Sequence, residues 1–216
     1  MLPSKRALSA IISIAVFLVG CKADLTANVA LSELQGTSSY MDAILSVEVP
    51  SCKEYDSDFE SSSLLKLKSR IPVIFPKANF LGCKSVGFDT VANFSVPIRV
   101  GQIHEECSGH DICLGSSESQ PSVIFAVAGK DFLSGYRKLE RSESNIEPSV
   151  IIGFTNDSDK TQDLFAISLY ADSDPIQFSS IYIQSKRYAE LKLSNVAIDG
   201  ALKGKPVPIF IVEEAK

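Results

Sequence analysis

Hydrophobic and polar residues alternate most strictly in VANFSVPIRV, residues 91–100. One face of this segment would carry Ala92, Phe94, Val96, Ile98 and Val100, and the other would carry the polar residues and the proline. A period of two over ten residues predicts a strand with one buried and one solvated face. Pro97 has no amide proton, so we expect the strand to lie at a sheet edge, or to be paired there on one side only.

Other apolar segments predict further strands. They span residues 43–49, 71–76, 122–129, 150–155, 163–170, 176–184 and 207–214, with one or two more between 189 and 199. The loop NDSDKTQ joins 150–155 to 163–170, which is typical of a β-hairpin. GALKGKP (200–206) is expected to form a turn.

Helices are predicted at two places. Residues 61–70 begin with Ser61 and Ser62, either of which is a good N-cap, and residues 131–141 have an acidic first residue and a basic last one. Residues 22–42 are small and polar, which predicts a tether with a short helical turn at 31–34. We therefore expect an α+β fold, mainly antiparallel, with one or two short helices and with a β-sandwich as one arrangement that fits.

Composition narrows the class of protein. The 216 residues carry a formal net charge of −5 at pH 7, without a basic stripe or an arginine cluster, which argues against nucleic-acid binding. An apolar fraction of 45% is ordinary for a globular chain. We assign residues 43–216 to a single β-rich domain.

The N-terminal segment has the features of an export signal. Lys5 and Arg6 precede an apolar run at 7–19, which is short for a membrane span but has the length of a secretory core region. The run ends in LVGC (18–21), which resembles a bacterial lipobox. That resemblance implies that residues 1–20 are a lipoprotein signal peptide and that Cys21 carries the lipid. Lys22, in place of Asp, then favours the outer membrane, facing the periplasm.

Four cysteines remain in a chain expected to be exported, and an even number predicts disulfides. Four cysteines allow three connectivities. We favour Cys52–Cys83 and Cys107–Cys113, because the second pair is close in sequence.

HEECSGHDIC (104–113) offers a second interpretation, because His104, Cys107, His110 and Cys113 are all residue types that bind zinc. Steps of three residues turn about 300° each on a helix, so the first and last of these side chains would face opposite sides. The histidines are also six residues apart, whereas the zinc-protease helix needs four. We therefore favour a disulfide loop with its histidines at the surface and no metal. A metal-binding loop that uses His104 and His110 remains the alternative.

The layout resembles a group of uncharacterised envelope lipoproteins of enteric bacteria and their mobile elements. The segments that carry the likeness are LVGCKA (18–23), VEVPSC (47–52), FSVPI (94–98) followed by Val100-Gly101, and GKPVP (204–208). The resemblance implies an envelope lipoprotein and adds no catalytic residue or cofactor.

We therefore expect a non-enzymatic accessory or interaction domain that is bound to the membrane through its N-terminal lipid. An envelope protein is a candidate partner, and a sheet edge near residues 91–100 could pair with one of its strands. A small-molecule binding domain is a further hypothesis, and it predicts a large apolar pocket.

Overall fold

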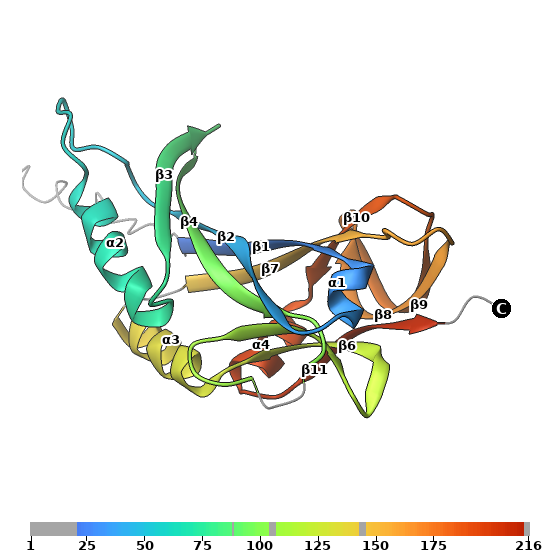
Figure 1. Ribbon diagram of the computed structural model, residues 1–216. Coiled ribbons are helices and arrows are strands. Elements are labelled where there is room, and N and C mark those ends of the chain that lie inside the picture. Colours follow the sequence, from blue (N-terminus) through green and yellow to red (C-terminus); the bar gives the residue numbers. More distant parts are fainter. Residues whose placement is uncertain (1–20, 88, 104–106, 143–145, 214–216) are drawn as a thin grey trace, which may run out of the picture.

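The computed structural model describes residues 21–87, 89–103, 107–142 and 146–213. These residues form eleven strands and four short helices, so the expected mainly-β fold is confirmed (Figure 1). The elements are β1 (Cys21–Ala30), α1 (Leu31–Gln35), β2 (Ser39–Glu48), α2 (Ser62–Ile74), β3 (Asn79–Val86), β4 (Asp89–Val100), β5 (Ile112–Ser117), β6 (Gln120–Ala128), α3 (Lys130–Ser142), β7 (Ile146–Thr155), β8 (Gln162–Ala171), β9 (Asp174–Ile183), β10 (Tyr188–Leu193), α4 (Asn195–Leu202) and β11 (Val207–Glu213).

All eleven strands belong to one sheet that closes on itself. The order is β10-β7-β1-β2-β4-β5-β6-β11-β8-β9, and β3 adds to β4. β8 pairs with β11 over residues 163–166 and with β10 over residues 169–171. The first strand of this order, β10, therefore pairs with β8 near the other end of the order. The sheet is therefore a closed barrel and not the two stacked layers of a sandwich. Its pairings are antiparallel except β1–β7 and β4–β5.

The strongest sequence prediction is confirmed by β4. Its five predicted inward residues are all buried, and its other face is partly exposed. β2 pairs with β4 from residue 91 to residue 100, whereas β3 reaches only Ser95 and β5 pairs only from Arg99 onward. At Pro97 the strand is thus paired on one side only, as a missing amide donor requires. Because β4 lies inside the sheet, the expectation that it offers a partner an open edge is wrong.

Residues 21–42 are not a tether. Residues 21–30 form β1, which lies between β2 and β7 and buries Leu25, Ala27 and Val29. The period of two is present but weak, because one of its three inward residues is only an alanine. The predicted helical turn is correct: α1 buries Leu31 and Leu34.

Two predicted strands are helical instead. Residues 71–76 mostly form the last turn of α2, where Ile71 and Ile74 lie one turn apart on the buried face and Pro72 is accommodated near the helix end. Residues 196–199 lie in α4, where the N-cap Ser194 accepts a hydrogen bond from the amide of Ala197. The N-cap Ser61 of α2 and the helix at α3 agree with prediction.

The predicted hairpin of 150–155 with 163–170 does not form, because β10 lies between β7 and β8. The connecting loop is organised by Asn156, a buried residue whose side-chain amide donates to the carbonyls of Lys160 and Ile183. β8 instead forms its hairpin with β9, through Asp172 and Ser173, both at positive φ.

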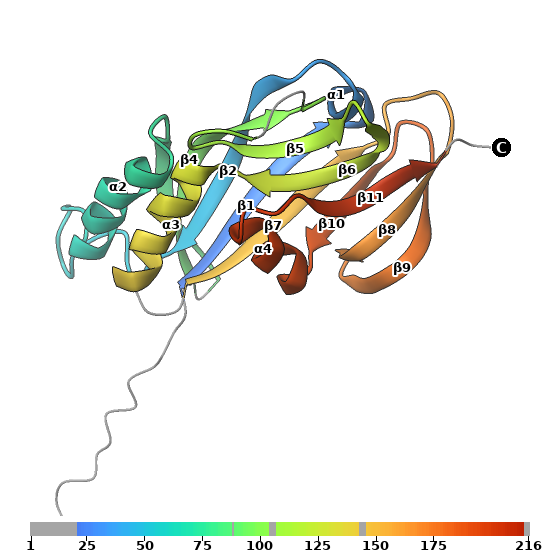
Figure 2. The same ribbon diagram turned by 90° about the horizontal axis from the view of Figure 1, so that it is seen from below.

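The two ends of the barrel are closed differently. α1 lies at the end where β1 finishes, and α2 and α3 pack side by side at the end where β1 starts (Figures 1 and 2). Inside the barrel, Phe154 and Phe210 pack edge to face with ring centroids 5.6 Å apart. None of the helices in the described ranges has both the length and the apolar character needed to span a bilayer.

Candidate functional site

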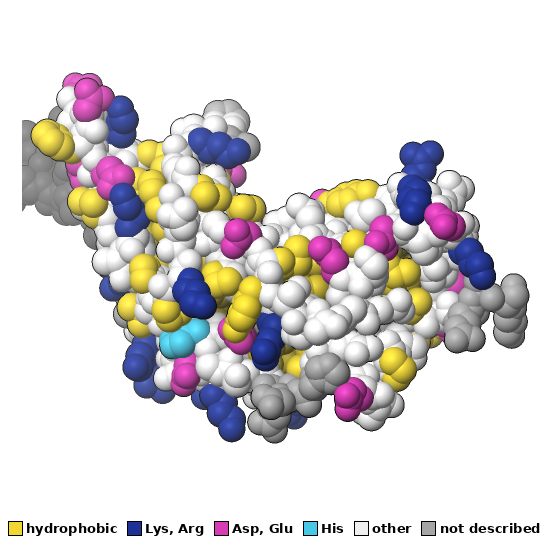
Figure 3. Space-filling model, in the orientation of Figure 1, with side chains coloured by type: hydrophobic (Ala, Val, Ile, Leu, Met, Phe, Trp, Pro, Cys, Tyr) yellow, Lys and Arg dark blue, Asp and Glu magenta, His cyan; other side chains and the backbone are white. Residues whose placement is uncertain are grey.

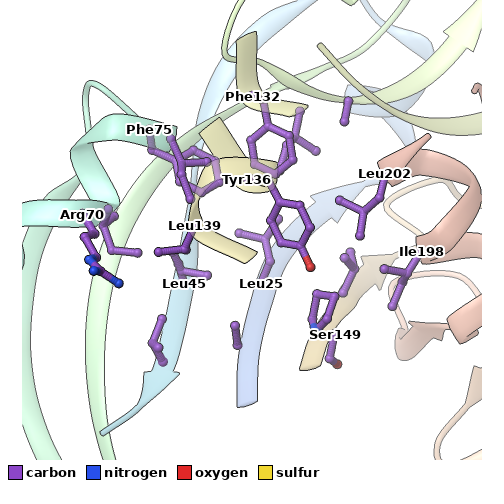
Figure 4. Close-up of a pocket in the computed structure, with 18 of the residues that line it drawn as sticks. Leu25, Leu45, Arg70, Phe75, Phe132, Tyr136, Leu139, Ser149, Ile198 and Leu202 are labelled. Carbon is purple, nitrogen blue, oxygen red and sulfur yellow. The ribbon is translucent and has the colours of Figure 1, made fainter. Parts of the chain in front are cut away.

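An apolar cavity of about 330 Å³ lies at the end of the barrel where β1 begins. Its walls come from α2, α3 and α4 and from the strand ends beneath them (Figure 4). Small-molecule pockets commonly have volumes of about 300–1,000 Å³, so this cavity has the size of a binding site.

The floor consists of two rows of side chains that cross three neighbouring strands. Val47, Ala23 and Pro148 form one row on β2, β1 and β7, as shown by the strand register. Leu45, Leu25 and Val150 form the next row. All six line the cavity, because residues two apart on a strand share a face. The small side chain of Ala23 in the middle strand leaves space above the floor.

The roof consists of helix faces with helical spacing. α3 contributes Phe132, Tyr136 and Leu139, and α4 contributes Ile198, Ala201 and Leu202. α2 contributes Ser63, Lys66, Leu67, Arg70, Ile71 and Ile74.

Aromatic stacking joins α2 to α3. The Phe75 ring, next to the end of α2, lies 5.3 Å from the Phe132 ring, which lies 6.2 Å from the Tyr136 ring. A methyl group at Gly135 would lie 3.1 Å from the carbonyl oxygen of Val73, so this glycine permits the close approach of the two helices.

The disulfide loop 107–113 also positions α3. The amides of Asp131 and Phe132 donate to the carbonyl of Gly109, at 2.9 and 3.1 Å. Gly129 lies so close to this loop that a side-chain carbon there would meet the carbonyl of Gly109 at 2.6 Å. The loop thus holds the first turn of a helix that forms part of the cavity roof.

Few polar groups interrupt the apolar lining. The Ser149 hydroxyl is buried and has no hydrogen-bond partner among the described residues (Figure 4). Burial raises the pKa of the Tyr136 hydroxyl, and Glu140 and Asp199 add to the shift, so this group stays protonated. The Tyr136 hydroxyl can donate a hydrogen bond to an uncharged polar atom of a ligand. Ser149 lies between the inward Pro148 and Val150 on β7, so its side chain points to the other face of the sheet.

Three charged residues contribute to the described lining: Glu48, Lys66 and Arg70. Lys66 and Arg70 lie four residues apart and therefore on one face of α2. The described lining residues include one carboxylate and neither His nor Cys. This arrangement is suited to hold an apolar molecule by burial of its surface.

The cysteines form the two favoured pairs. Cys52 and Cys83 are joined with their Cα atoms 5.7 Å apart, and Cys107 and Cys113 with theirs 5.9 Å apart. Cys21 begins β1, two residues before Ala23 of the cavity floor.

Of the two histidines of the alternative metal-binding loop, the structure describes His110. His104 lies outside the described residues. His110 is half-buried, and its Nδ1 lies 2.9 Å from the carbonyl oxygen of Ile74. Among the described residues, no group of three or more His, Cys, Asp or Glu side chains could hold a metal ion.

Away from the cavity, basic and acidic side chains are intermingled on the face shown in Figure 3. The cavity itself was not located by sequence reasoning, although it is the feature that the small-molecule hypothesis requires. Its one local signal is the spacing of Phe132, Tyr136 and Leu139 on α3.

A family model described as "Domain of unknown function (DUF7424)" matches residues 23–216. The chain belongs to this family. The search of curated proteins and the search of solved structures each found no match.

Proposed function

We propose that this member of the DUF7424 family is a lipid-anchored protein of the cell envelope whose domain binds an apolar ligand without catalysing a reaction. The observation that carries the proposal is the apolar cavity beneath α2, α3 and α4. Anchoring is supported by the sequence: a basic start, an apolar run and LVGC at 18–21. Lys22 favours the periplasmic face of the outer membrane.

The lining predicts what the cavity binds. Each methylene group removed from water contributes about 0.8 kcal/mol, so affinity should increase with the chain length of an alkyl ligand until the cavity is full. A ligand with many polar groups would lose hydration without finding partners, because the described lining offers few hydrogen-bonding groups.

The proposed anchor and the cavity lie at the same end of the domain. Cys21 lies two positions before Ala23 of the floor, which corresponds to about 7 Å along a strand. A lipid on Cys21 would therefore hold this end of the barrel close to the membrane, where apolar molecules are most concentrated.

Ligand binding is tested with Ala201→Phe, which places a large ring on the cavity side of α4. Val196→Phe is the matched control, because Val196 lies on the same helix and is 78% exposed. We expect wild type and V196F to bind a fluorescent naphthylamine probe, and alkyl alcohols to displace it with affinity that rises with chain length. A201F should bind the probe at least tenfold more weakly. Equal binding by A201F and V196F, in proteins of equal stability, would show that the cavity is not the site.

Anchoring is tested by the intact mass of the protein purified from membranes. We expect a mass that lacks residues 1–20 and includes an acylated Cys21. A mass that retains residues 1–20, or an unmodified Cys21, would contradict the lipid anchor.

An interaction with an envelope protein is the second candidate function. It is favoured by β9, which pairs only with β8 in the described structure and exposes Phe178 and Tyr182. A photoreactive residue at position 178 should give one discrete adduct in cells. A smear, or the same adducts as a photoreactive residue at exposed Tyr55, would count against a specific partner.

A further inference from the structure

We infer that the ligand is an anionic amphiphile, whose acyl chain occupies the cavity and whose acidic headgroup contacts Lys66 and Arg70. This inference rests on the proposed function and adds the chemical class of the ligand. It follows from how charge and apolar surface are distributed on α2.

On the side of α2 that lines the cavity, buried apolar side chains lie next to two cationic ones. Ile71 is buried and lines the cavity, Arg70 is half-buried, and Lys66 is exposed. Long basic side chains pack their methylene stems along apolar surface and keep the charged group near water. Lys66, which is exposed, therefore belongs to the rim of the cavity, whereas Nη1 of the half-buried Arg70 is shielded from water, and Figure 4 shows Arg70 at one side of the site.

The charge at this rim favours an anion. Lys66 and Arg70 are the cations of the described lining. Its one acidic residue, Glu48, follows the inward Val47 on β2 and so points to the opposite face of the sheet, whereas Glu140 and Asp199 lie near Tyr136. A guanidinium group binds a carboxylate or phosphate through two parallel hydrogen bonds, and an ammonium group adds a second positive charge. Lys66 and Arg70 also interact with other protein groups, so a headgroup would join or replace those partners.

The Tyr136 hydroxyl suits the neutral part of the same ligand. Tyr136 lies across the cavity from Arg70 in Figure 4. Its hydroxyl can donate to an uncharged oxygen, such as that of an ester, whereas the rest of the lining is almost entirely apolar. An amphiphile with an acyl chain and an acidic headgroup thus matches the apolar lining, the Tyr136 hydroxyl and the two cationic side chains of the site.

The test compares three ligands with the same chain: dodecanoate, dodecanol and dodecylammonium. The variant is Lys66→Gln with Arg70→Gln. The matched control is Lys130→Gln with Arg137→Gln, which makes the same charge change on the exposed face of α3, outside the cavity lining.

We expect wild type and the control to bind dodecanoate roughly 5- to 20-fold more tightly than dodecanol, since two partly exposed ion pairs contribute that much together. The ratio should fall to about one in the K66Q/R70Q variant, and salt should reduce it in wild type. Equal affinity of wild type for dodecanoate and dodecanol, or a preference for dodecylammonium, would overturn the inference and leave the apolar cavity site intact. Failure of all three ligands to bind would overturn the proposed function itself.

A second arm distinguishes the sources of such a ligand. Vesicles that contain labelled phosphatidylglycerol are mixed with the protein, and transfer of label is compared with binding of free dodecanoate. Transfer that is lost in K66Q/R70Q identifies a membrane phospholipid. Binding of dodecanoate without transfer identifies a free fatty acid.

Discussion

Removal of the Cys52–Cys83 disulfide should cost more stability than removal of Cys107–Cys113. The first bridge attaches the loop before α2 to β3. The amide of Ser61, the N-cap of α2, donates to the carbonyl of Cys52, so the bridge also fixes the point where α2 begins. Loss of this cross-link therefore affects a helix that lines the cavity.

The sizes of the two closed loops determine the expected difference. The bridges span sequence separations of 31 and 6 residues. In the chain-entropy relation, cross-links of these lengths destabilise the unfolded chain by about 3.7 and about 2.2 kcal/mol, a difference of about 1.5 kcal/mol.

The measurement is urea denaturation of Cys52→Ala/Cys83→Ala and of Cys107→Ala/Cys113→Ala beside the wild type. Cys113 is fully buried, so alanine is used in place of serine to avoid burying a new hydroxyl group. Wild type unfolded in the presence of a reductant gives the loss of both bridges without any change of side chain. If C107A/C113A lost as much stability as C52A/C83A, or more, loop entropy would not be the main contribution of these bridges.

Three further predictions concern local contacts. Gly115→Ala should destabilise the fold by about 3 kcal/mol or more, because the added carbon would lie 1.8 Å from the carbonyl oxygen of Gly101; a urea midpoint close to that of wild type would contradict the close approach of these strands. Ser61→Ala should cost about 1 kcal/mol by removing the N-cap of α2, whereas Ser61→Asn, which can still cap, should recover part of the loss in the same assay. A hydrogen bond from Ser32 lowers the pKa of the Asp157 carboxyl, so the stability that this carboxylate contributes is present above about pH 4 and is lost as the pH falls through the lowered pKa. In Ser32→Ala the free energy of unfolding should fall less steeply between pH 5 and pH 3, and an unchanged slope would rule out this hydrogen bond as the cause.

Local patterns in the sequence were sufficient to predict several elements. β4 follows from a period of two sustained over ten residues, and its buried face agrees with prediction at every position. The starts of α2 and α3 follow from polar residues that satisfy or complement the free amides of a first turn. The cysteine pairs follow from an even count and from the short spacing of Cys107 and Cys113.

Where the local signal was weak or ambiguous, the prediction failed. Residues 21–30 carry small residues that resemble a linker, and they become a strand because β2 and β7 pair with both edges. Residues 71–74 are apolar enough for a strand, but they continue α2, whose buried face includes Ile71 and Ile74.

The sequence by itself determined which side of several elements is apolar and where two of the helices begin, and it favoured one of the three possible pairings of the four cysteines. Only the tertiary structure decided that the sheet closes, that β10 separates β7 from β8, and that an apolar cavity forms where the helices cover the barrel end. A residue pattern records that a face avoids water, but not which distant segment covers it. The cavity depends on that second kind of information, because its walls come from segments between residue 23 and residue 202 that meet only in the folded chain.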